Sequence, residues 1–176
     1  LVSIMSEPGF KERTILLDGF SKAYAMTRWR IGYGVMRADL AAHFSRPMVN
    51  SNSCTASFTQ MAGVEALRGD QTSVDRMRDE FHARAKMFVE GLNQIRGFSC
   101  RMPKGAFYAF PNITGTALTS KELSDALLDE AGIASLSGAS FGEFGEGYLR
   151  FSVANSMENL GNALERIAGW VKTKGI

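Results

Sequence analysis

A lysine and an arginine lie eight residues apart in the segment GFSKAYAMTRWRIGYG, residues 19–34. The segment is largely apolar, and a glycine stands at each of its ends. Two cations held between strand-like residues repel each other, and both are costly to desolvate unless an anionic or covalent partner compensates them. The pattern therefore indicates that Lys22 and Arg30 hold a bound ligand.

Lys22 has the side chain that covalent chemistry on an aldehyde needs. A buried lysine loses its proton easily, and its free amine is then a nucleophile that can form a Schiff base. A neighbouring Arg30 would lower the lysine pKa further, and its planar guanidinium suits a phosphate group. Ser21 adds a hydroxyl donor beside the lysine. The alternative is that Lys22 and Arg30 are solvated residues at loop ends, and their spacing alone does not decide between the two interpretations.

Arg150 is the second unusual cation. It stands between two apolar residues in the alternating segment EGYLRFSVA, where a lone charge has no structural purpose of its own. One interpretation is an ion pair with Glu143 or Glu146. The glycine-rich segment SFGEFGEG, residues 140–147, has its glycines in the order G-x-x-G-x-G, which differs from the nucleotide-binding motif, and a flexible loop is expected there.

The composition excludes several classes of protein. With 45% hydrophobic and 22% charged residues, the 176-residue chain can bury a core. Twenty basic residues against eighteen acidic ones give a net charge of +2, too balanced for an electrostatic nucleic-acid binder, and no apolar run is long enough for a membrane span. Cys54 and Cys100 are isolated, which suits a reducing cytoplasm. His43 and His82 also stand alone, so no metal site is expected.

The predicted elements interleave strands and helices, which is typical of an α/β chain. Strands are expected at 14–18, 30–36, 98–102, 106–113, 133–137 and 148–154. Helices are expected across 55–96 with a break at 68–71, across 119–132, and from 156 onward. Gly97 is expected to close the apolar stripe of the first helical region. The 119–132 helix has the clearest signature, because Thr119 and Glu122 can form a capping box and Gly132 allows a left-handed stop.

Four segments, taken in order, resemble the class I/II aminotransferases, which are fold-type I pyridoxal-phosphate enzymes. FSKAYAMTRWRIGYGV is similar to the family's Schiff-base segment, in which Ser-Lys is followed after seven residues by Arg-x-Gly-Tyr. NSNSCTASFTQMAGVEAL resembles the entry to the long interdomain helices, and PKGAFYAFPN resembles the Pro-x-Gly-Ala-Phe-Tyr strand. SGASFGEFGEGYLRFSVA resembles the last catalytic segment. The resemblance covers nearly the whole chain, and its first and last segments are specific.

The resemblance implies a role for each candidate residue. Lys22 would carry pyridoxal phosphate as a Schiff base and would move protons between the two halves of transamination. Arg30 would bind the cofactor phosphate, with Ser21 next to it. Arg150 would hold the α-carboxylate of an amino acid or 2-oxo acid substrate. The full-length protein would be a cytoplasmic homodimer that transfers amino groups.

The resemblance also implies that the chain is the C-terminal part of the fold-type I fold. Residues 1–50 would end the large cofactor-binding domain, and 51–176 would form the small α/β domain with the long interdomain helices. The opening LVSIMSEPGF, which lacks an initiator Met, favours a longer parent. In the family, the ring-stacking aromatic residue and the carboxylate that pairs with the pyridine nitrogen lie upstream of the lysine. The 176-residue chain alone is therefore expected to be inactive.

Three positions depart from the family pattern. Arg28 stands where a small glycine is usual, so it either points to solvent or crowds the cofactor loop. Gly19 replaces the phosphate-binding serine of many relatives, which removes one hydroxyl contact. Ser137 replaces a proline before the glycine-rich loop, and this is expected to be a minor change.

Two other functions stay open. The same scaffold carries lyases and decarboxylating enzymes that use the same lysine. A transcription regulator with an aminotransferase-like sensor domain would need an upstream DNA-binding helix-turn-helix, and this chain contains no basic recognition helix.

Overall fold

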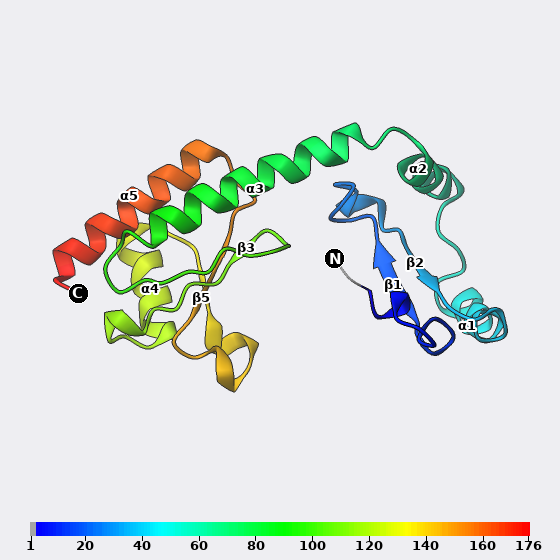
Figure 1. The fold of residues 1–176 in the computed structure, drawn as a ribbon, viewed down its shortest axis with the longest axis horizontal. Coiled ribbons are helices and arrows are strands. Elements are labelled where there is room, and N and C mark those ends of the chain that lie inside the picture. The colour runs from blue at the N-terminus through cyan, green and yellow to red at the C-terminus, as the bar shows by residue number, and fades with distance from the viewer. Residues whose placement is uncertain (1–2) are drawn as a thin grey trace. The chain divides into compact units, whose positions relative to one another are not determined.

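The computed structural model describes residues 3–176, which separate into two compact units. The first unit reaches to Asp75, and the second is Arg76–Ile176. The first contains β1 (Leu16–Gly19), β2 (Gly32–Val35), α1 (Ala38–Ser51) and α2 (Ser57–Arg68) (Figure 1). Next come α3 (Thr72–Leu92), β3 (Tyr108–Ala109), α4 (Ser120–Ala131), β4 (Leu136–Ser137), β5 (Leu149–Ser152) and α5 (Met157–Lys174). The predicted α/β class is confirmed.

An antiparallel hairpin of β1 and β2 forms the centre of the first unit. Its register pairs Asp18 with Tyr33 and Gly19 with Gly32. A Cβ added at Gly32 would lie 2.9 Å from the carbonyl oxygen of Asp18, so the close pairing at this end requires a glycine. The strands predicted at 14–18 and 30–36 are confirmed, although both are shorter than predicted. The hairpin brings the two ends of the lysine segment together.

Helix α2 packs on the connection between these strands. Gly63 is buried in α2, and a Cβ there would lie 2.9 Å from Cδ1 of Ile31 and 3.5 Å from the Phe20 ring. The helix can therefore approach the connection closely because this position has no side chain. The predicted break at 68–71 is confirmed, since α2 ends at Arg68 and α3 begins at Thr72. Oδ1 of Asp70 accepts hydrogen bonds from the backbone N–H and the hydroxyl of Thr72 and so caps the start of α3.

The second unit has the larger core. Helices α3 and α5 run side by side (Figure 1), and they approach so closely that a Cβ at Gly91 would overlap the side chain of Leu164. Helix α4 packs against α5 and β4. The core members buried most completely are apolar residues from these helices and from the strands and loops between them: Phe88, Leu92, Ala109, Ile113, Leu123, Leu127, Leu149, Val153 and Ile167.

The sheet of the second unit is antiparallel, in the order β3-β5-β4. The strand predicted at 98–102 is wrong, because only Ser99 forms a single bridge, with Asn112. Asn93 supplies the physical reason. Its amide oxygen accepts from the N–H of Cys100 at 2.7 Å, and its amide nitrogen donates to the carbonyl of Cys100 at 3.0 Å. A side chain thus takes the two hydrogen bonds that a neighbouring strand would make. The strands predicted at 106–113 and 133–137 shrink to two residues each.

The helix ends mostly follow the sequence signals. Thr119 and Glu122 form the predicted capping box of α4, and Gly132 ends that helix in the left-handed conformation. Ser156 caps α5 as predicted. Gly97 does not end α3, which stops at Leu92; instead it takes a positive φ of 86° in the following turn. Among residues 3–176, no helix is both long enough and apolar enough to cross a membrane.

Candidate active site

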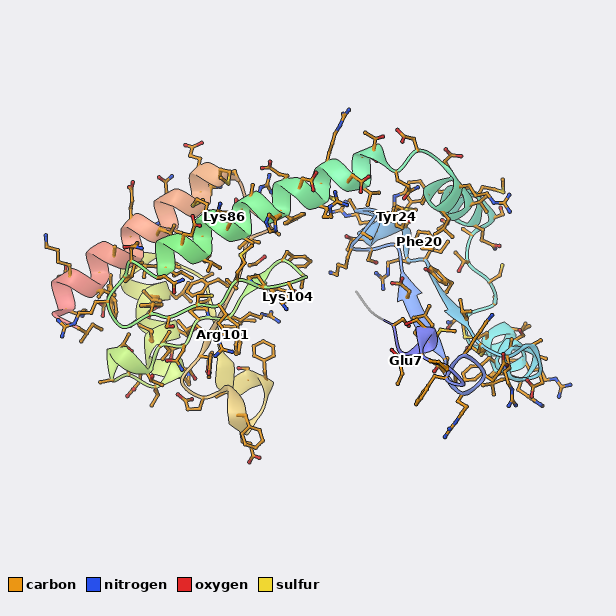
Figure 2. All side chains as sticks on the ribbon, in the orientation of Figure 1. Glu7, Phe20, Tyr24, Lys86, Arg101 and Lys104 are labelled. Atoms are coloured by element: carbon orange, nitrogen blue, oxygen red, sulfur yellow. The ribbon has the colours of Figure 1, made fainter. Side chains whose placement is uncertain are left out.

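Phe20 organises the connection that carries the predicted lysine. Its side chain is 3% exposed and packs between the rings of Tyr24 and Tyr33, at centroid distances of 5.4 and 5.5 Å. Its backbone carbonyl accepts hydrogen bonds from Tyr24 and Met26, and its N–H donates to the carbonyl of Ile31. Figure 2 shows Phe20 and Tyr24 together at this connection. The connection is therefore a loop whose backbone is hydrogen-bonded at Phe20 and whose side chains pack around the buried Phe20 ring.

Lys22 lies on the outer side of this loop. Its carbonyl accepts from the N–H of Ala25 at 3.1 Å, which fixes its backbone in a tight turn. It lines an open, shallow hollow of about 450 Å³ together with Asp18, Ser21 and others. Lys22 is exposed. The burial on which the sequence argument relied is thus not supplied by residues 3–176.

Arg30 and Ser21 are linked through Thr27, a residue that the sequence analysis did not single out. Nη1 of Arg30 donates to the carbonyl of Thr27 at 3.1 Å, and the Thr27 hydroxyl donates to the carbonyl of Ser21 at 3.1 Å. Arg30 has a left-handed φ of 50°, which is unusual for a residue with a side chain. Its other guanidinium N–H groups donate to no residue of the described chain. Arg28 is exposed.

Asp18 and Tyr33 hold the base of the loop, and they too went unrecognised in the sequence. Oδ1 of Asp18 accepts from the N–H of Gly19 at 2.7 Å, and Oδ2 accepts from the Tyr33 hydroxyl at 3.2 Å. Burial, followed by the nearby Asp18 carboxylate, raises the pKa of Tyr33. A Cβ at Gly19 would lie 3.6 Å from the carbonyl of Ile31, an ordinary contact distance. A serine side chain would therefore fit at position 19, so crowding does not explain why a glycine stands there in place of the serine of many relatives.

Arg150 stands on β5 in the second unit, opposite Leu136 of β4. Its guanidinium carbon lies 4.3 Å from the centre of the Tyr108 ring and 4.5 Å from the centre of the Phe141 ring. A guanidinium within this distance of two aromatic rings is stabilised by both. The side chain is half-buried, and its N–H groups donate to no residue between 3 and 176. Arg150 therefore lies close to two aromatic rings, and its N–H groups are available to a ligand as far as residues 3–176 are concerned.

The alternative role for Arg150, an ion pair with a nearby glutamate, is wrong for the described residues. The Glu146 carboxylate instead accepts two hydrogen bonds from Ser120, and Glu143 is exposed. The segment 140–147 overlaps two 3₁₀ turns, Gly138–Phe141 and Glu143–Gly145, and has no strand-to-helix turn of the nucleotide-binding kind.

Comparison with known proteins identifies the family. The family model "Aminotransferase class I and II" matches residues 3–167. The chain is 40% identical to a putative aminotransferase, YugH, of Bacillus subtilis over 165 residues, which are 94% of this chain and 42% of that protein. It is 41% identical to an aspartate aminotransferase of Pyrococcus horikoshii, across 89% of this chain and 40% of the relative.

A solved structure of an aromatic aminotransferase from Pyrococcus horikoshii OT3 superposes with a TM-score of 0.94 at 39% identity. The match covers 98% of this chain and 46% of that one. The chain thus spans less than half the length of the relatives that it matches. Its sequence and its fold lead to the same conclusion: the chain belongs to the class I and II aminotransferase family.

Proposed function

We propose that this chain is the C-terminal portion of a pyridoxal-phosphate-dependent aminotransferase, which transfers an amino group between an amino acid and a 2-oxo acid. The observation that carries the proposal is the single loop on which Ser21, Lys22 and Arg30 meet, with Thr27 linking the first and last of them. The printed names of the relatives include aspartate and aromatic-amino-acid aminotransferases, which supports an amino acid as the substrate.

The donor set of the loop fits the proposed cofactor. The primary amine of Lys22 suits an aldehyde, while the guanidinium of Arg30 and the hydroxyl of Ser21 suit a phosphate. When bound, pyridoxal phosphate supplies an electron sink for the bonds to the substrate α-carbon. The proposal assigns covalent attachment to Lys22 and phosphate binding to Arg30 and Ser21.

Each residue also has a task of its own in the reaction. Lys22, which would hold the cofactor, would also act as general base and acid: its Nζ would accept the α-proton of the substrate and later return a proton. The bond from Arg30 to the carbonyl of Thr27 holds its guanidinium at the loop. Arg150 binds the substrate α-carboxylate with two parallel N–H donors, which fixes the direction of the reacting Cα–H bond as well as the position of the substrate.

The proposal extends to the full-length protein. Residues 1–50 would complete a large cofactor-binding domain, and 51–176 would form a small domain. The full-length protein would act as a homodimer, and this chain alone would lack the partner of the cofactor ring and so be inactive.

Steady-state kinetics of the full-length protein test the function. We expect turnover of an amino acid to depend on an added 2-oxo acid and to follow ping-pong kinetics. Lys22→Ala should abolish turnover while the protein stays folded. Product formation without an oxo acid acceptor would favour a lyase. A helix-turn-helix upstream, with no turnover, would favour a transcription regulator.

A further inference from the structure

A polar cluster built on the buried Ser120 connects α4 to the loop that precedes Arg150. Oε1 of Glu146 accepts from the backbone N–H of Ser120 at 2.7 Å, and Oε2 accepts from the Ser120 hydroxyl at 2.7 Å. The Ser120 hydroxyl also lies 2.7 Å from the hydroxyl of Ser137. Ser120 is fully buried and is the first residue of α4. A carboxylate at this place satisfies a free N–H group and complements the helix dipole.

The cluster fastens the loop at both ends. Ser137 precedes the first 3₁₀ turn and Glu146 follows the second, and both bind the same serine of α4. Between these ends the backbones of the two turns are in direct contact at Gly138 and Gly145. A Cβ at Gly138 would overlap the carbonyl oxygen of Gly145. The loop therefore has one compact form that is attached to a core helix.

This loop carries Phe141. Half of the Phe141 surface is exposed, and its ring meets Phe110 edge-on at 6.1 Å and lies 4.5 Å from the Arg150 guanidinium. The position of this half-exposed ring therefore depends on the backbone of its loop as well as on the contact with Phe110. Phe144 gives the contrast, because it belongs to the same loop, is 90% exposed, and forms no ring contact with the described residues.

We propose that Glu146, by binding Ser120, is a positioning residue that holds Phe141 against Arg150 and so fixes the guanidinium plane for a substrate carboxylate. This inference rests on the proposed function, in which Arg150 binds that carboxylate. The ring of Tyr108, on β3, lies 4.3 Å from the same guanidinium carbon. A guanidinium held in its bound orientation loses less conformational freedom when the carboxylate arrives, which strengthens binding without adding a contact.

The test uses the full-length protein loaded with its cofactor and two matched pairs of variants. Calorimetry measures the Kd of a 2-methyl amino acid, which keeps the α-carboxylate but has no Cα–H bond to break. Phe141→Leu should raise this Kd about fivefold, the loss expected for one exposed cation–π contact. Phe144→Leu should leave it within about twofold.

The second pair addresses the glutamate. Glu146→Ala should raise the Kd of the 2-methyl amino acid and the KM of the substrate, and neither increase should exceed that caused by Phe141→Leu. The kcat at saturating substrate and the cofactor content should stay unchanged. Glu146→Gln, which keeps an acceptor for the Ser120 N–H, should restore most of the affinity. Glu143→Ala removes a carboxylate from the same loop and should have no such effect. Since Glu146 acts through Phe141, the double variant should bind like Phe141→Leu alone.

Two results would overturn the inference. In the first, Glu146→Ala lowers the melting temperature but leaves the Kd equal to that of Glu143→Ala, which would make the cluster a helix cap and nothing more. In the second, the effects of Glu146→Ala and Phe141→Leu add in full. If Arg150→Lys itself left the Kd unchanged, the carboxylate role in the proposed function would fail as well, so the two failures can be told apart.

Discussion

The guanidinium carbon of Arg150 lies 4.3 Å from the centre of the ring of Tyr108, a residue 42 positions earlier in the chain. The centre of the Phe141 ring lies 4.5 Å from the same guanidinium carbon. The residues before and after Arg150 in its strand are buried and apolar. The two aromatic rings therefore stabilise a cation at a position where it has no acidic partner among the described residues. It also leaves the N–H edge available for a planar anion.

Arg150→Lys is expected to weaken catalysis and to spare the cofactor. Lysine keeps the charge but loses both the two-pronged donor geometry and the stacking between rings. The value of kcat/KM should fall for amino acids and 2-oxo acids alike. The fall corresponds to a loss of roughly 2–4 kcal/mol of transition-state stabilisation. Cofactor content, measured by absorbance, should stay at the wild-type level. Release of the cofactor would show that Arg150 has a different role, and Arg101→Lys, at an exposed position, serves as the control.

Thr27→Val is expected to weaken cofactor binding without touching the cofactor directly. The substitution removes the hydroxyl that bonds to the carbonyl of Ser21, and so loosens the link between the two proposed phosphate-binding residues. The Kd of pyridoxal phosphate should rise about fivefold, the effect of one net hydrogen bond. Thr14→Val is the matched control, because its hydroxyl bonds to the carbonyl of Phe10 outside the loop. Equal affinities for the two variants would contradict the positioning role of Thr27.

Much of the fold follows from local signals in the sequence. Helix α4 was predictable because Thr119, Glu122 and Gly132 act within one turn of the helix ends. The two strands of the hairpin were predictable because each is a short apolar run bounded by a turn or a polar stretch, whereas their pairing was not predicted. Helix α1 has no counterpart among the predicted elements, and Pro47, which argues against a helix in a sequence, lies inside it.

The features that sequence reasoning missed depend on distant partners. The strand predicted at 98–102 fails because the side chain of Asn93 occupies the hydrogen-bonding groups of Cys100. The aromatic partners of Arg150 come from β3 and from a 3₁₀ turn, and no spacing rule connects them. A buried serine at 120 with an acidic residue 26 positions later gives no pattern either. The assignment of Lys22, Ser21 and Arg30 to a cofactor site stays a prediction, and it rests on their place in a specific family segment.

Two glycine substitutions are expected to change the free energy of unfolding in opposite directions. Gly91→Ala places a Cβ against Leu164 where α3 and α5 meet, and should destabilise by about 1–3 kcal/mol. Gly161→Ala, in α5, meets open space and should stabilise by about 0.5–1 kcal/mol through helix propensity. Denaturant unfolding of the full-length protein measures both. If Gly91→Ala were as harmless as Gly161→Ala, the close helix contact would be wrong.

Glu146 is expected to make the protein sensitive to acid. Hydrogen bonds from the Ser120 hydroxyl and backbone lower the pKa of Glu146 below its ordinary value of 4.5. A carboxyl whose pKa is lower in the folded state contributes stability above pH 4.5, and the contribution is lost as the pH falls through the lowered value. Glu146→Gln should therefore reduce the loss of stability on acidification, as measured by melting temperature against pH. The pKa of Glu122, at the same helix end, is also lowered, so Glu122 contributes to the acid sensitivity of wild type and variant alike. The effect of Glu146 is therefore the difference between the melting temperatures of the two proteins at each pH.

Covalent mapping of the cofactor tests the central claim most directly. The full-length protein is loaded with pyridoxal phosphate, reduced with borohydride and digested, and the labelled peptide is sequenced. We expect a single stoichiometric label on Lys22, and we expect Lys22→Arg to abolish it while leaving the protein folded. A label spread over exposed lysines such as Lys86 and Lys104, or one that persists in Lys22→Arg, would contradict the assignment of the 19–34 loop as the cofactor site.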